Sequence, residues 1–387
     1  MRGDRQPHPT EDELDRPPKI TIPAELLPVD GRFGAGPSKV PADAVAALAE
    51  AAPVLLGTSH RRDPVKAMVG RLRQGLAELF SLPDGYEVVL GNGGTTVLWD
   101  ALVFGLIERR SAHAVFGEFS SKFAHATAAA PHLEPPVIRR SEAGSHPVMG
   151  SVEDADVVAL THNETSTGVA MPVERPSDEP LIAVDATSAA GGMRVDPSKF
   201  DVYYFAPQKA FASDGGLWIA LCSPRALERI ERVGSGDRYI PAAIDLGLAL
   251  DNARNNQTIN TPALATIFLM VHQLEWMLRH GGLEWCAQRC ERSADVLYGW
   301  AESDPLATPF VADPAMRSPV VGTIDLDAAI DAPEVSRVLR AHGIFDTEPY
   351  RKLGRNQLRI GMYPAVEPSD VGQLTRCIEF VIEALAG

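Results

Sequence analysis

The 387-residue sequence has little of several features that identify particular classes of protein. Basic residues are in deficit: the formal net charge is −15, so no cationic excess is available to neutralise the phosphates of a nucleic acid. No stretch of about 18 consecutive apolar residues occurs, so we expect no membrane span. Residues 1–23 are polar and proline-rich without an apolar core, so we expect no signal peptide. These absences predict a cytoplasmic protein that binds neither nucleic acid nor a membrane.

Cysteine is also scarce. The sequence contains neither a CxxC pair nor a histidine near the closest two cysteines, so we expect free buried thiols and no metal site. It also lacks GxGxxG and GxxxxGK[ST], which argues against dinucleotide and P-loop sites. The four cysteines are Cys222, Cys286, Cys290 and Cys377.

The rest of the composition is that of a globular enzyme, with 45% hydrophobic and 22% charged residues. The length suggests about two domains. From changes of pattern along the chain we expect a weakly ordered arm over residues 1–30, a large domain over 31–275 and a small C-terminal domain over 276–387.

In the large domain, short β-branched runs alternate with helical stretches. Several runs are nearly continuous in apolar residues, as in strands that helices cover on both faces. This pattern predicts an α/β domain with a mainly parallel sheet flanked by helices. The expected strands are EVVLGN ending at Asn92, AHAVFGE ending at Glu118, DVVALTHNE ending at Glu164, LIAVDAT ending at Thr187, DVYYFAPQ ending at Gln208, and GLWIALCS around Cys222.

The chain changes character after a long apolar helix, TPALATIFLMVHQLEWMLRH, for which we expect Thr261 as N-cap and Pro262 at the first helical position. A helix (WCAQRCERSADVLYGWAES), two strands (VVGTIDL and QLRIGMY) and a closing helix follow. This mixture predicts a smaller α+β domain.

Polar or aromatic residues follow several expected strands, at the edge where open α/β sheets bind ligands. Gly91–Thr96 (GNGGTT) opens a helix, and its small residues would let backbone N–H groups approach an anion, although a plain turn explains them equally well. Phe119 could stack on a flat ring or belong to the core. Asn163–Gly168 could hydrogen-bond a phenolate-like oxygen or cap a turn.

Two charged residues end apolar runs. Asp185 follows LIAV, where a carboxylate needs a partner such as a protonated ring nitrogen, unless it caps the next turn. Lys209 follows DVYYFAPQ, and a lysine in an apolar crevice is expected to have a lowered pKa, as an amine nucleophile requires. Taken together, the two residues favour a functional site over unrelated surface charges.

The runs Asp185–Ser188 (DATS) and Ala206–Lys209 (APQK) resemble the core of the fold-type-I pyridoxal-phosphate enzymes, in particular the class V aminotransferases, whose large domain is like that of aspartate aminotransferase. Three further stretches narrow the resemblance to the phosphoserine aminotransferases: Gly34–Ser38 (GAGPS), Ser59–Arg61 (SHR) and Asn260–Pro262 (NTP). The resemblance covers about residues 31 to 385.

The resemblance implies pyridoxal 5′-phosphate as cofactor, carried as a Schiff base by Lys209, which would also move the substrate proton. Asp185 would keep the ring nitrogen protonated, and Thr165 would hydrogen-bond the 3′ oxygen of the ring. Phe119 matches a stacking position that the family usually fills with tryptophan. A homodimer with shared active sites is also implied, because two phosphate-binding positions reach across from the other subunit. The phosphate-binding positions are Thr95, Thr96 and Gln208, with Asn260 and Thr261 from that second subunit.

On the substrate side, the resemblance assigns substrate anions to His60 and Arg61 and to two positions of a basic strip. In that strip Arg351 matches a phosphate-binding arginine, and Arg359 matches the arginine that holds the α-carboxylate, a bidentate task suited to guanidinium. The family usually has histidine where Tyr350 stands and fewer residues between the two arginines. The division of labour therefore stays open among Arg351, Lys352, Arg355 and Arg359.

The implied reaction is a ping-pong transfer of the amino group from L-glutamate to 3-phosphohydroxypyruvate, which gives O-phospho-L-serine and 2-oxoglutarate in serine biosynthesis. A related phosphorylated substrate would yield 4-phosphohydroxy-L-threonine for vitamin B6. The alternatives are a serine–glyoxylate aminotransferase, a cysteine desulfurase, for which no cysteine is suitably placed, and a non-enzymatic regulatory module with the same fold. A nicotinamide dehydrogenase is disfavoured by the missing glycine spacing.

Overall fold

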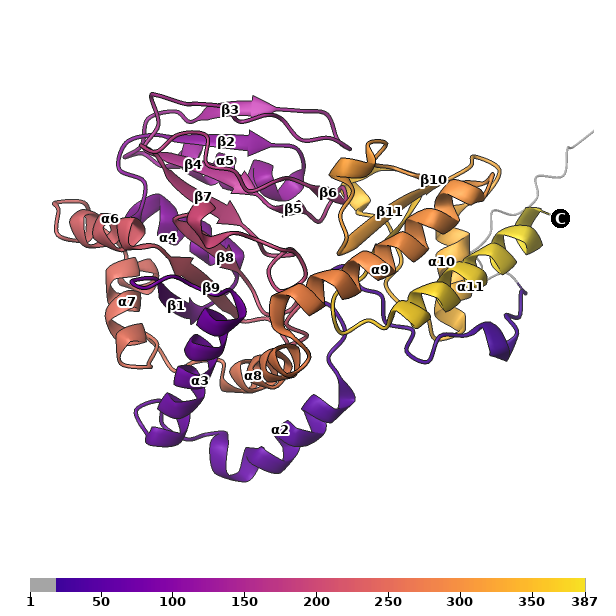
Figure 1. Cartoon of the computed structure of the whole chain (residues 1–387), viewed down its shortest axis with the longest axis horizontal. Helices are drawn as coiled ribbons and strands as arrows, with labels where there is room; N and C mark the ends of the chain where they lie inside the picture. The colour runs from indigo at the N-terminus through magenta and orange to yellow at the C-terminus, as the bar shows by residue number, and fades with distance from the viewer. Residues whose placement is uncertain (1–18, 387) are drawn as a thin grey trace, which may run out of the picture.

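The computed structural model describes residues 19–386, which form two packed units joined along one side (Figure 1). The larger unit contains a seven-stranded sheet of order β1-β9-β8-β7-β4-β2-β3. Its strands are β1 (Glu87–Asn92), β2 (Ser111–Val115), β3 (Val137–Arg140), β4 (Val157–Thr161), β7 (Leu181–Asp185), β8 (Val202–Phe205) and β9 (Leu217–Cys222).

Strand direction in this sheet brings the ends of several strands to one edge. The pairs β2–β3, β2–β4, β4–β7 and β7–β8 are parallel, whereas β9 is antiparallel to both β8 and β1. Every strand except β9 therefore runs the same way, and their carboxyl ends share an edge. The sheet is mainly parallel, as the sequence predicted, and residues that follow β1, β4, β7 and β8 can meet there.

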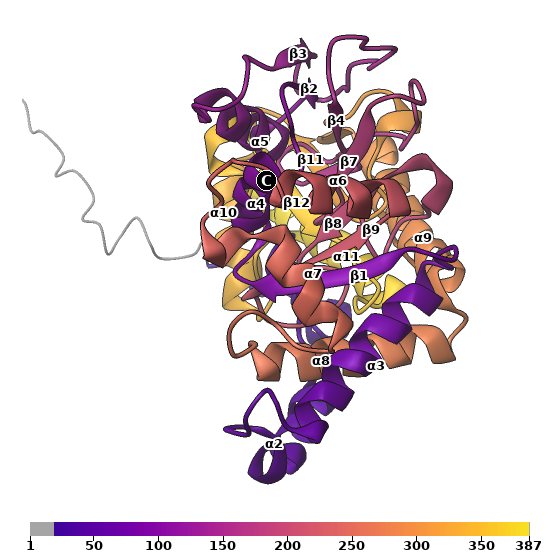
Figure 2. The same cartoon turned by 90° about the vertical axis from the view of Figure 1, so that its left-hand side faces the viewer.

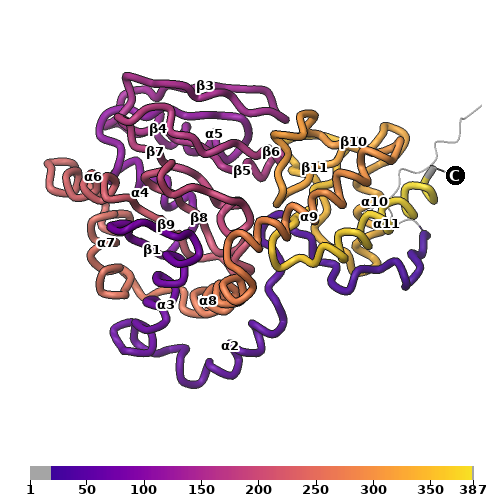
Figure 3. Tube along the Cα trace, viewed as in Figure 1, coloured from indigo at the N-terminus to yellow at the C-terminus, as the bar shows by residue number. Residues whose placement is uncertain are grey.

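Helices cover the sheet on both faces (Figure 2). They bury its apolar side chains: the rings of Tyr203 and Phe205 on β8 contact each other and the ring of Phe80, which follows the first helix packed there. Helix α2 (Ala42–Leu55) projects from this unit at the bottom of the view, and Val54 on it is exposed (Figure 3). The remaining helices are α3 (Asp63–Leu79), α4 (Thr95–Gly105), α5 (Glu118–Ala129), α6 (Pro224–Gly234), α7 (Leu246–Arg254) and α8 (Leu264–Arg279).

The smaller unit has its own apolar cluster, to which Ile324, Val335, Leu358 and Ile378 belong. It is built on a three-stranded antiparallel sheet of order β10-β11-β12. Its elements are α9 (Gly282–Ser303), β10 (Ala307–Pro309), β11 (Val321–Leu326), α10 (Ala332–Ala341), β12 (Gln357–Gly361) and α11 (Pro368–Ala386).

Short elements complete the chain. A two-stranded hairpin, β5 (Asn163–Glu164) with β6 (Val169–Ala170), leaves the large sheet and points toward the smaller unit. The 3-10 turns are η1 (Ala24–Leu26), η2 (Pro197–Lys199), η3 (Ala242–Ile244), η4 (Pro314–Met316) and η5 (Arg351–Leu353). Among residues 19–386, no helix combines the length and apolarity that a membrane crossing requires.

The N-terminal arm predicted over residues 1–30 differs from the structure in its second part. Its first 18 residues lie outside the described part of the chain. Residues 19–30 instead pack on the smaller unit: Ile22 is buried, the Val29 N–H donates to Asp370, and the Cys377 thiol donates to the Leu26 carbonyl. Ile22 and Leu26 place apolar side chains against that unit's core, and this contact orders the segment.

Several predicted element ends are also wrong. The strands expected to end at Glu164, Thr187 and Gln208 stop at Thr161, Asp185 and Phe205, where the chain turns into the loops at the edge of the sheet. Helix α8 begins at Leu264 after Ala263, so neither Thr261 nor Pro262 is its cap or first residue. Asn92 accounts for this, because its side chain bonds both the Thr261 carbonyl and the Ala263 N–H and holds the segment before the helix extended. The strand expected to end at Glu118 stops at Val115, and Glu118 already starts helix α5.

Candidate functional site

A cavity of about 310 Å³ opens at the shared carboxyl edge of the sheet. It lies where β1, β2, β4, β7 and β8 end, and the segments after those strands supply most of its wall. The residues that line it are Gly36, Pro37, Gly94, Thr95, Thr96, Trp99, Phe119, Lys122, Asn163, Thr165, Asp185, Thr187, Gln208 and Lys209. Eight of the predicted site residues are thus brought together: Thr95, Thr96, Phe119, Thr165, Asp185, Gln208 and Lys209 line it, and Arg359 contacts Thr165 from the second unit.

Asp185 ends β7 at the floor of this cavity. One carboxylate oxygen accepts hydrogen bonds from the Thr187 N–H at 2.9 Å and hydroxyl at 2.6 Å, and the other accepts from Trp99 Nε1 at 3.2 Å. Burial nevertheless raises the pKa of Asp185 to about 6, because no cation among the described residues pairs with it. The carboxylate is held in a fixed orientation and lacks only a positive partner.

Lys209 follows β8 and turns its amine into the same cavity, where Nζ donates to the Ala35 carbonyl oxygen at 2.7 Å. The pKa of Lys209 is lowered to about 7, chiefly by burial and secondly by the nearby Arg359 cation, while Asp185 opposes the shift. Gly36 makes room for this side chain, since a Cβ on Gly36 would lie 1.8 Å from Nζ. The amine is thus buried, close to neutral at physiological pH and aimed at open space.

Unpaired polar atoms in the wall indicate a polar ligand. Thr165 donates its hydroxyl to Ser188 at 2.8 Å, and the Asn163 amide does the same. The side-chain carbonyls of Asn163 and Gln208 are buried without a hydrogen-bond partner among residues 19–386. Buried polar atoms are rarely left unpaired, so these two acceptors indicate a polar ligand, and the Asp185 carboxylate fits a ring that offers an N–H group.

The start of α4 forms part of the cavity wall and is suited to bind an anion. Gly94 precedes the helix in an extended conformation, and no side chain caps the first N–H groups of α4. Thr95 and Thr96 stand at this helix start, and the Thr95 hydroxyl is 2.9 Å from that of Thr187. Free N–H groups and the helix dipole favour a phosphate here.

The structure places another group of predicted residues away from this cavity. His60, Arg61, Asn260 and Thr261 do not line it, and Thr261 Oγ1 lies 3.5 Å from His60 Nδ1. Arg61, Asn260 and Thr261 are exposed. The four residues therefore share a surface next to the site without entering it from their own chain.

The basic strip divides into different environments. Arg359, on β12, donates to the Thr165 carbonyl at 3.3 Å and lies 5.5 Å from the Tyr350 ring centroid, and its Nε is buried without a partner among residues 19–386. Arg355 instead pairs with Asp325, so it is committed to the fold of the smaller unit. Of the strip, the structure thus places Arg359 at the cavity and removes Arg355 from it.

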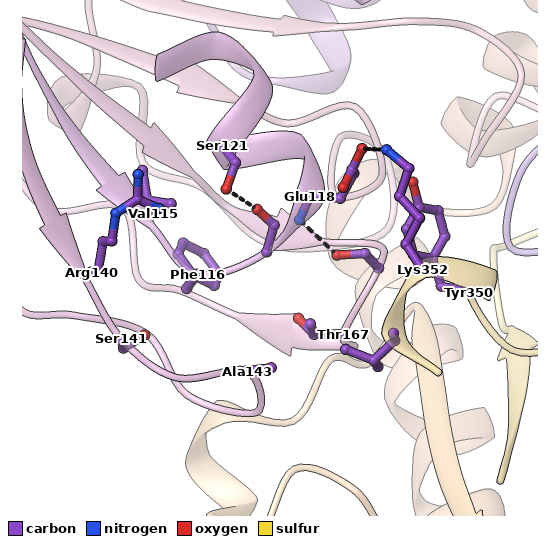
Figure 4. Close-up of a pocket in the computed structure, with 13 residues that line it drawn as sticks. Val115, Phe116, Glu118, Ser121, Arg140, Ser141, Ala143, Thr167, Tyr350 and Lys352 are labelled. Carbon is purple, nitrogen blue, oxygen red and sulfur yellow. Dashed lines mark hydrogen bonds and ion pairs between the residues drawn. The ribbon is translucent and has the colours of Figure 1, made fainter. Parts of the chain in front are cut away.

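Arg351 and Lys352 belong to η5, and Lys352 lines a second cavity of about 280 Å³ (Figure 4). Lys352 forms an ion pair with Glu118 across the boundary of the two units. Arg351 is exposed and makes no ion pair within the described part of the chain. Tyr350 lines the second cavity and Phe119 lines the first. Their ring centroids are 6.1 Å apart.

Sequence reasoning did not identify Trp99 as a site residue. It lies one turn after Thr95 in α4, so its ring lines the cavity and its indole N–H reaches Asp185. Within the apolar run VLWDALVF a tryptophan is expected to belong to the hydrophobic core. Only its spacing of one helical turn from Thr95 could have indicated that it lines the cavity. The four cysteines are buried free thiols, and none lines the cavity.

Comparison with known proteins accords with this site. A sequence model described as Aminotransferase class-V matches residues 32–347. The chain is 59% identical over 370 residues to a phosphoserine aminotransferase of Nocardioides sp., covering 95% of this chain and 99% of that protein. It is 56% identical over 370 residues to a putative phosphoserine aminotransferase of Mycobacterium leprae, with 95% and 98% covered.

A solved structure supports the same grouping. The phosphoserine aminotransferase of Cytophaga hutchinsonii superimposes with a TM-score of 0.83 at 26% sequence identity, covering 91% of this chain and 99% of that one. Fold, family model and sequence identity agree over nearly the whole chain. The chain therefore belongs to the class-V aminotransferase family, within its group of phosphoserine aminotransferases.

Proposed function

We propose that this protein transfers the amino group of L-glutamate to 3-phosphohydroxypyruvate, producing O-phospho-L-serine and 2-oxoglutarate, in the cytoplasm. The observation that carries the proposal is the position of Lys209. Its buried amine has a pKa lowered to about 7 and lies in one cavity with the Asp185 carboxylate, while the Arg359 guanidinium approaches from the second unit. Amino-group transfer needs three groups within one site: an amine that is neutral near pH 7, a carboxylate that pairs with the protonated cofactor ring, and a cation that binds the substrate carboxylate.

The cavity fits pyridoxal 5′-phosphate. The start of α4, with Thr95, Thr96 and Gln208, would hold its phosphate, Asp185 its ring nitrogen and Thr165 its 3′ oxygen. Phe119 would lie against the ring face. When bound, this cofactor withdraws electrons from the bond that breaks at the substrate α-carbon.

Lys209 would act as the acid and base of the reaction. With a pKa of about 7, its amine takes up and returns a proton at similar cost near neutral pH. The Ala35 carbonyl holds that amine at 2.7 Å when it is not reacting. Trp99 and Thr187 would keep the Asp185 carboxylate aligned, because both of its oxygens already accept their hydrogen bonds.

Substrate binding would depend on cations from two directions. Arg359 would bind the α-carboxylate, since it is the strip's cation at the cavity and its Nε is unpaired in the described chain. Arg351 would bind the phosphate group, because it is exposed beside the site and makes no ion pair with residues 19–386. Lys352 is already paired with Glu118.

A homodimer would complete the site. His60, Arg61, Asn260 and Thr261 share one surface outside their own chain's cavity, which suits residues that reach the substrate and cofactor phosphate of a second copy. We propose the boundary between the large and small domains near residue 275, within α8, because most of the larger apolar core lies before it and most of the smaller one after it.

The visible absorption spectrum of the purified protein tests the proposal. We expect a band from lysine-bound cofactor that L-glutamate removes and 3-phosphohydroxypyruvate restores, and no such band in Lys209→Ala. A band that responds only to unphosphorylated oxo acids would refute the substrate. A protein that takes up no pyridoxal phosphate would refute the enzyme.

A further inference from the structure

Glu164 is a buried carboxylate without a cation. It is fully buried in β5, and no ion pair within residues 19–386 includes it. Instead its two oxygens accept five hydrogen bonds. The donors to Oε1 are the Phe119 N–H (3.3 Å) and the Ser166 N–H (3.3 Å) and hydroxyl (2.7 Å), and those to Oε2 are the Ser120 N–H (3.0 Å) and hydroxyl (2.9 Å).

These hydrogen bonds join two elements that line the cofactor cavity. Phe119 and Ser120 form the first turn of α5, whereas Glu164 precedes Thr165 directly. The carboxylate thus fixes the height of the Phe119 backbone relative to Thr165. A further bond, from the Glu118 N–H to the Ser166 hydroxyl at 3.1 Å, strengthens the same junction (Figure 4).

The local sequence is adapted to this carboxylate. A Cβ on Gly117, just before α5, would lie 2.3 Å from Glu164 Cγ and 2.4 Å from Cδ. Gly117 has a φ of −178°, which any residue can adopt, so the requirement for glycine is spatial rather than conformational. The absent side chain leaves the space that the carboxylate occupies under the helix start.

We propose that Glu164 is a positioning residue that sets the distance between the Phe119 ring and the cofactor ring. The inference rests on the proposed function, since it needs pyridoxal phosphate in the cavity. Glu164 does not touch that cavity itself: Phe119, Thr165 and Asn163 line it, and Glu164 does not. It acts through the backbone N–H groups of α5, which an ionised carboxylate at a helix N-terminus holds strongly.

The test compares Glu164→Gln with Asp201→Asn. The amide keeps the shape of Glu164 but sets an NH₂ group against a backbone N–H, so the backbone hydrogen bonds to one of the two carboxylate oxygens are lost. Asp201 is a buried-carboxylate control at the opposite edge of the sheet: it is 1% exposed and accepts from the Ile182 N–H and the Ser223 hydroxyl. Unlike Glu164 it also pairs with Arg175 and Arg225, so its substitution should destabilise the fold at least as much. Three quantities are measured: the melting temperature of the cofactor-free protein, the dissociation constant of pyridoxal phosphate, and the visible circular dichroism of bound cofactor.

We expect both variants to melt at lower temperature, because each loses buried hydrogen bonds. Only Glu164→Gln should bind pyridoxal phosphate about tenfold more weakly, a change of about 1.4 kcal/mol, and show a reduced circular dichroism band. Gly117→Ala provides a second route should Glu164→Gln not fold, because its methyl displaces the same carboxylate without removing the charge. It should weaken cofactor binding in the same direction, and the two changes together should be less than additive.

Three results would overturn the inference. If the wild type binds the cofactor and Glu164→Gln or Gly117→Ala binds it equally well with an unchanged dichroism band, Glu164 is only a helix cap and the proposed function stands. If Asp201→Asn loses cofactor affinity and dichroism to the same extent, the effect reports general destabilisation. A wild type that binds no pyridoxal phosphate overturns the proposed function and this inference together.

Discussion

The lowered pKa of Lys209 makes a quantitative prediction about its reactivity. A fall from 10.5 to about 7 corresponds to about 5 kcal/mol, and at pH 7 it raises the neutral fraction of the amine roughly a thousandfold over an ordinary lysine. Because only the neutral amine attacks a carbonyl, cofactor-free protein should combine with pyridoxal phosphate at a rate that increases with pH and levels off above about pH 7. Stopped-flow absorbance of the adduct measures this rate.

The same experiment separates the causes of the shift. Burial contributes most and Arg359 second, so Arg359→Gln should move the midpoint to higher pH but leave it below the value of an exposed lysine. Arg355→Gln is the matched control, because Arg355 belongs to the same strip but pairs with Asp325, and its midpoint should equal that of the wild type. A wild-type midpoint above about pH 9, or an Arg359→Gln midpoint that does not move, would show that the reasoning is wrong.

Three further predictions concern other parts of the site. Gly36→Ala should abolish cofactor attachment while the protein stays folded, because its methyl overlaps Lys209 Nζ. Visible absorbance measures attachment and circular dichroism measures folding; normal attachment would contradict the prediction. The folded-state pKa of Asp185, about 6, lies above its unfolded value, so its ionised form lowers stability above about pH 6 but not below about pH 4. Asp185→Asn should therefore raise the melting temperature of cofactor-free protein at pH 8 but not at pH 4, and weaken cofactor binding at least roughly tenfold. Arg351→Ala should raise KM for 3-phosphohydroxypyruvate roughly tenfold with little change in KM for glutamate. Steady-state kinetics with both substrates measure the two values, and an equal rise in both would refute the phosphate assignment.

Patterns in the sequence predicted the large sheet well because its strands are fully buried. Apolar runs such as LIAVD and DVYYF are typical of strands covered on both faces, so strand positions and the mainly parallel order followed from them. The antiparallel β9 was not predicted, because its sequence, LWIALC, is as apolar as the others and direction depends on the connection between strands.

Element ends were less predictable, for reasons of tertiary contact. Thr261-Pro262 has the local features of a helix start, yet Asn92 binds the segment from a distant strand and delays the helix. Similarly, Ile22 has no local partner, and only its contact with the smaller unit shows why residues 19–30 are ordered.

The cofactor cavity was more predictable than the substrate side. Asp185 and Lys209 come at the ends of strands whose order can be inferred, so their meeting follows from the sheet. The basic strip lies in a loop around η5, where the sequence gives no geometry, and only the structure separates Arg359 from Arg355. Trp99 and Glu164 were missed because each looks like a core or turn residue until its hydrogen-bond partner is known.

The Ala35 carbonyl connects the chemistry of the lysine to the interior of the smaller unit. Its oxygen accepts hydrogen bonds from both Lys209 Nζ at 2.7 Å and the Tyr363 hydroxyl at 2.8 Å, and two residues earlier the Phe33 carbonyl accepts from the Gly361 N–H. We therefore expect a displacement of β12 to shift residues 33–35 and with them the acceptor of the reactive amine. Substitutions among apolar residues that never meet substrate should thus alter lysine reactivity, and the effect of changing one residue at the active site should depend on which residues fill the distant core.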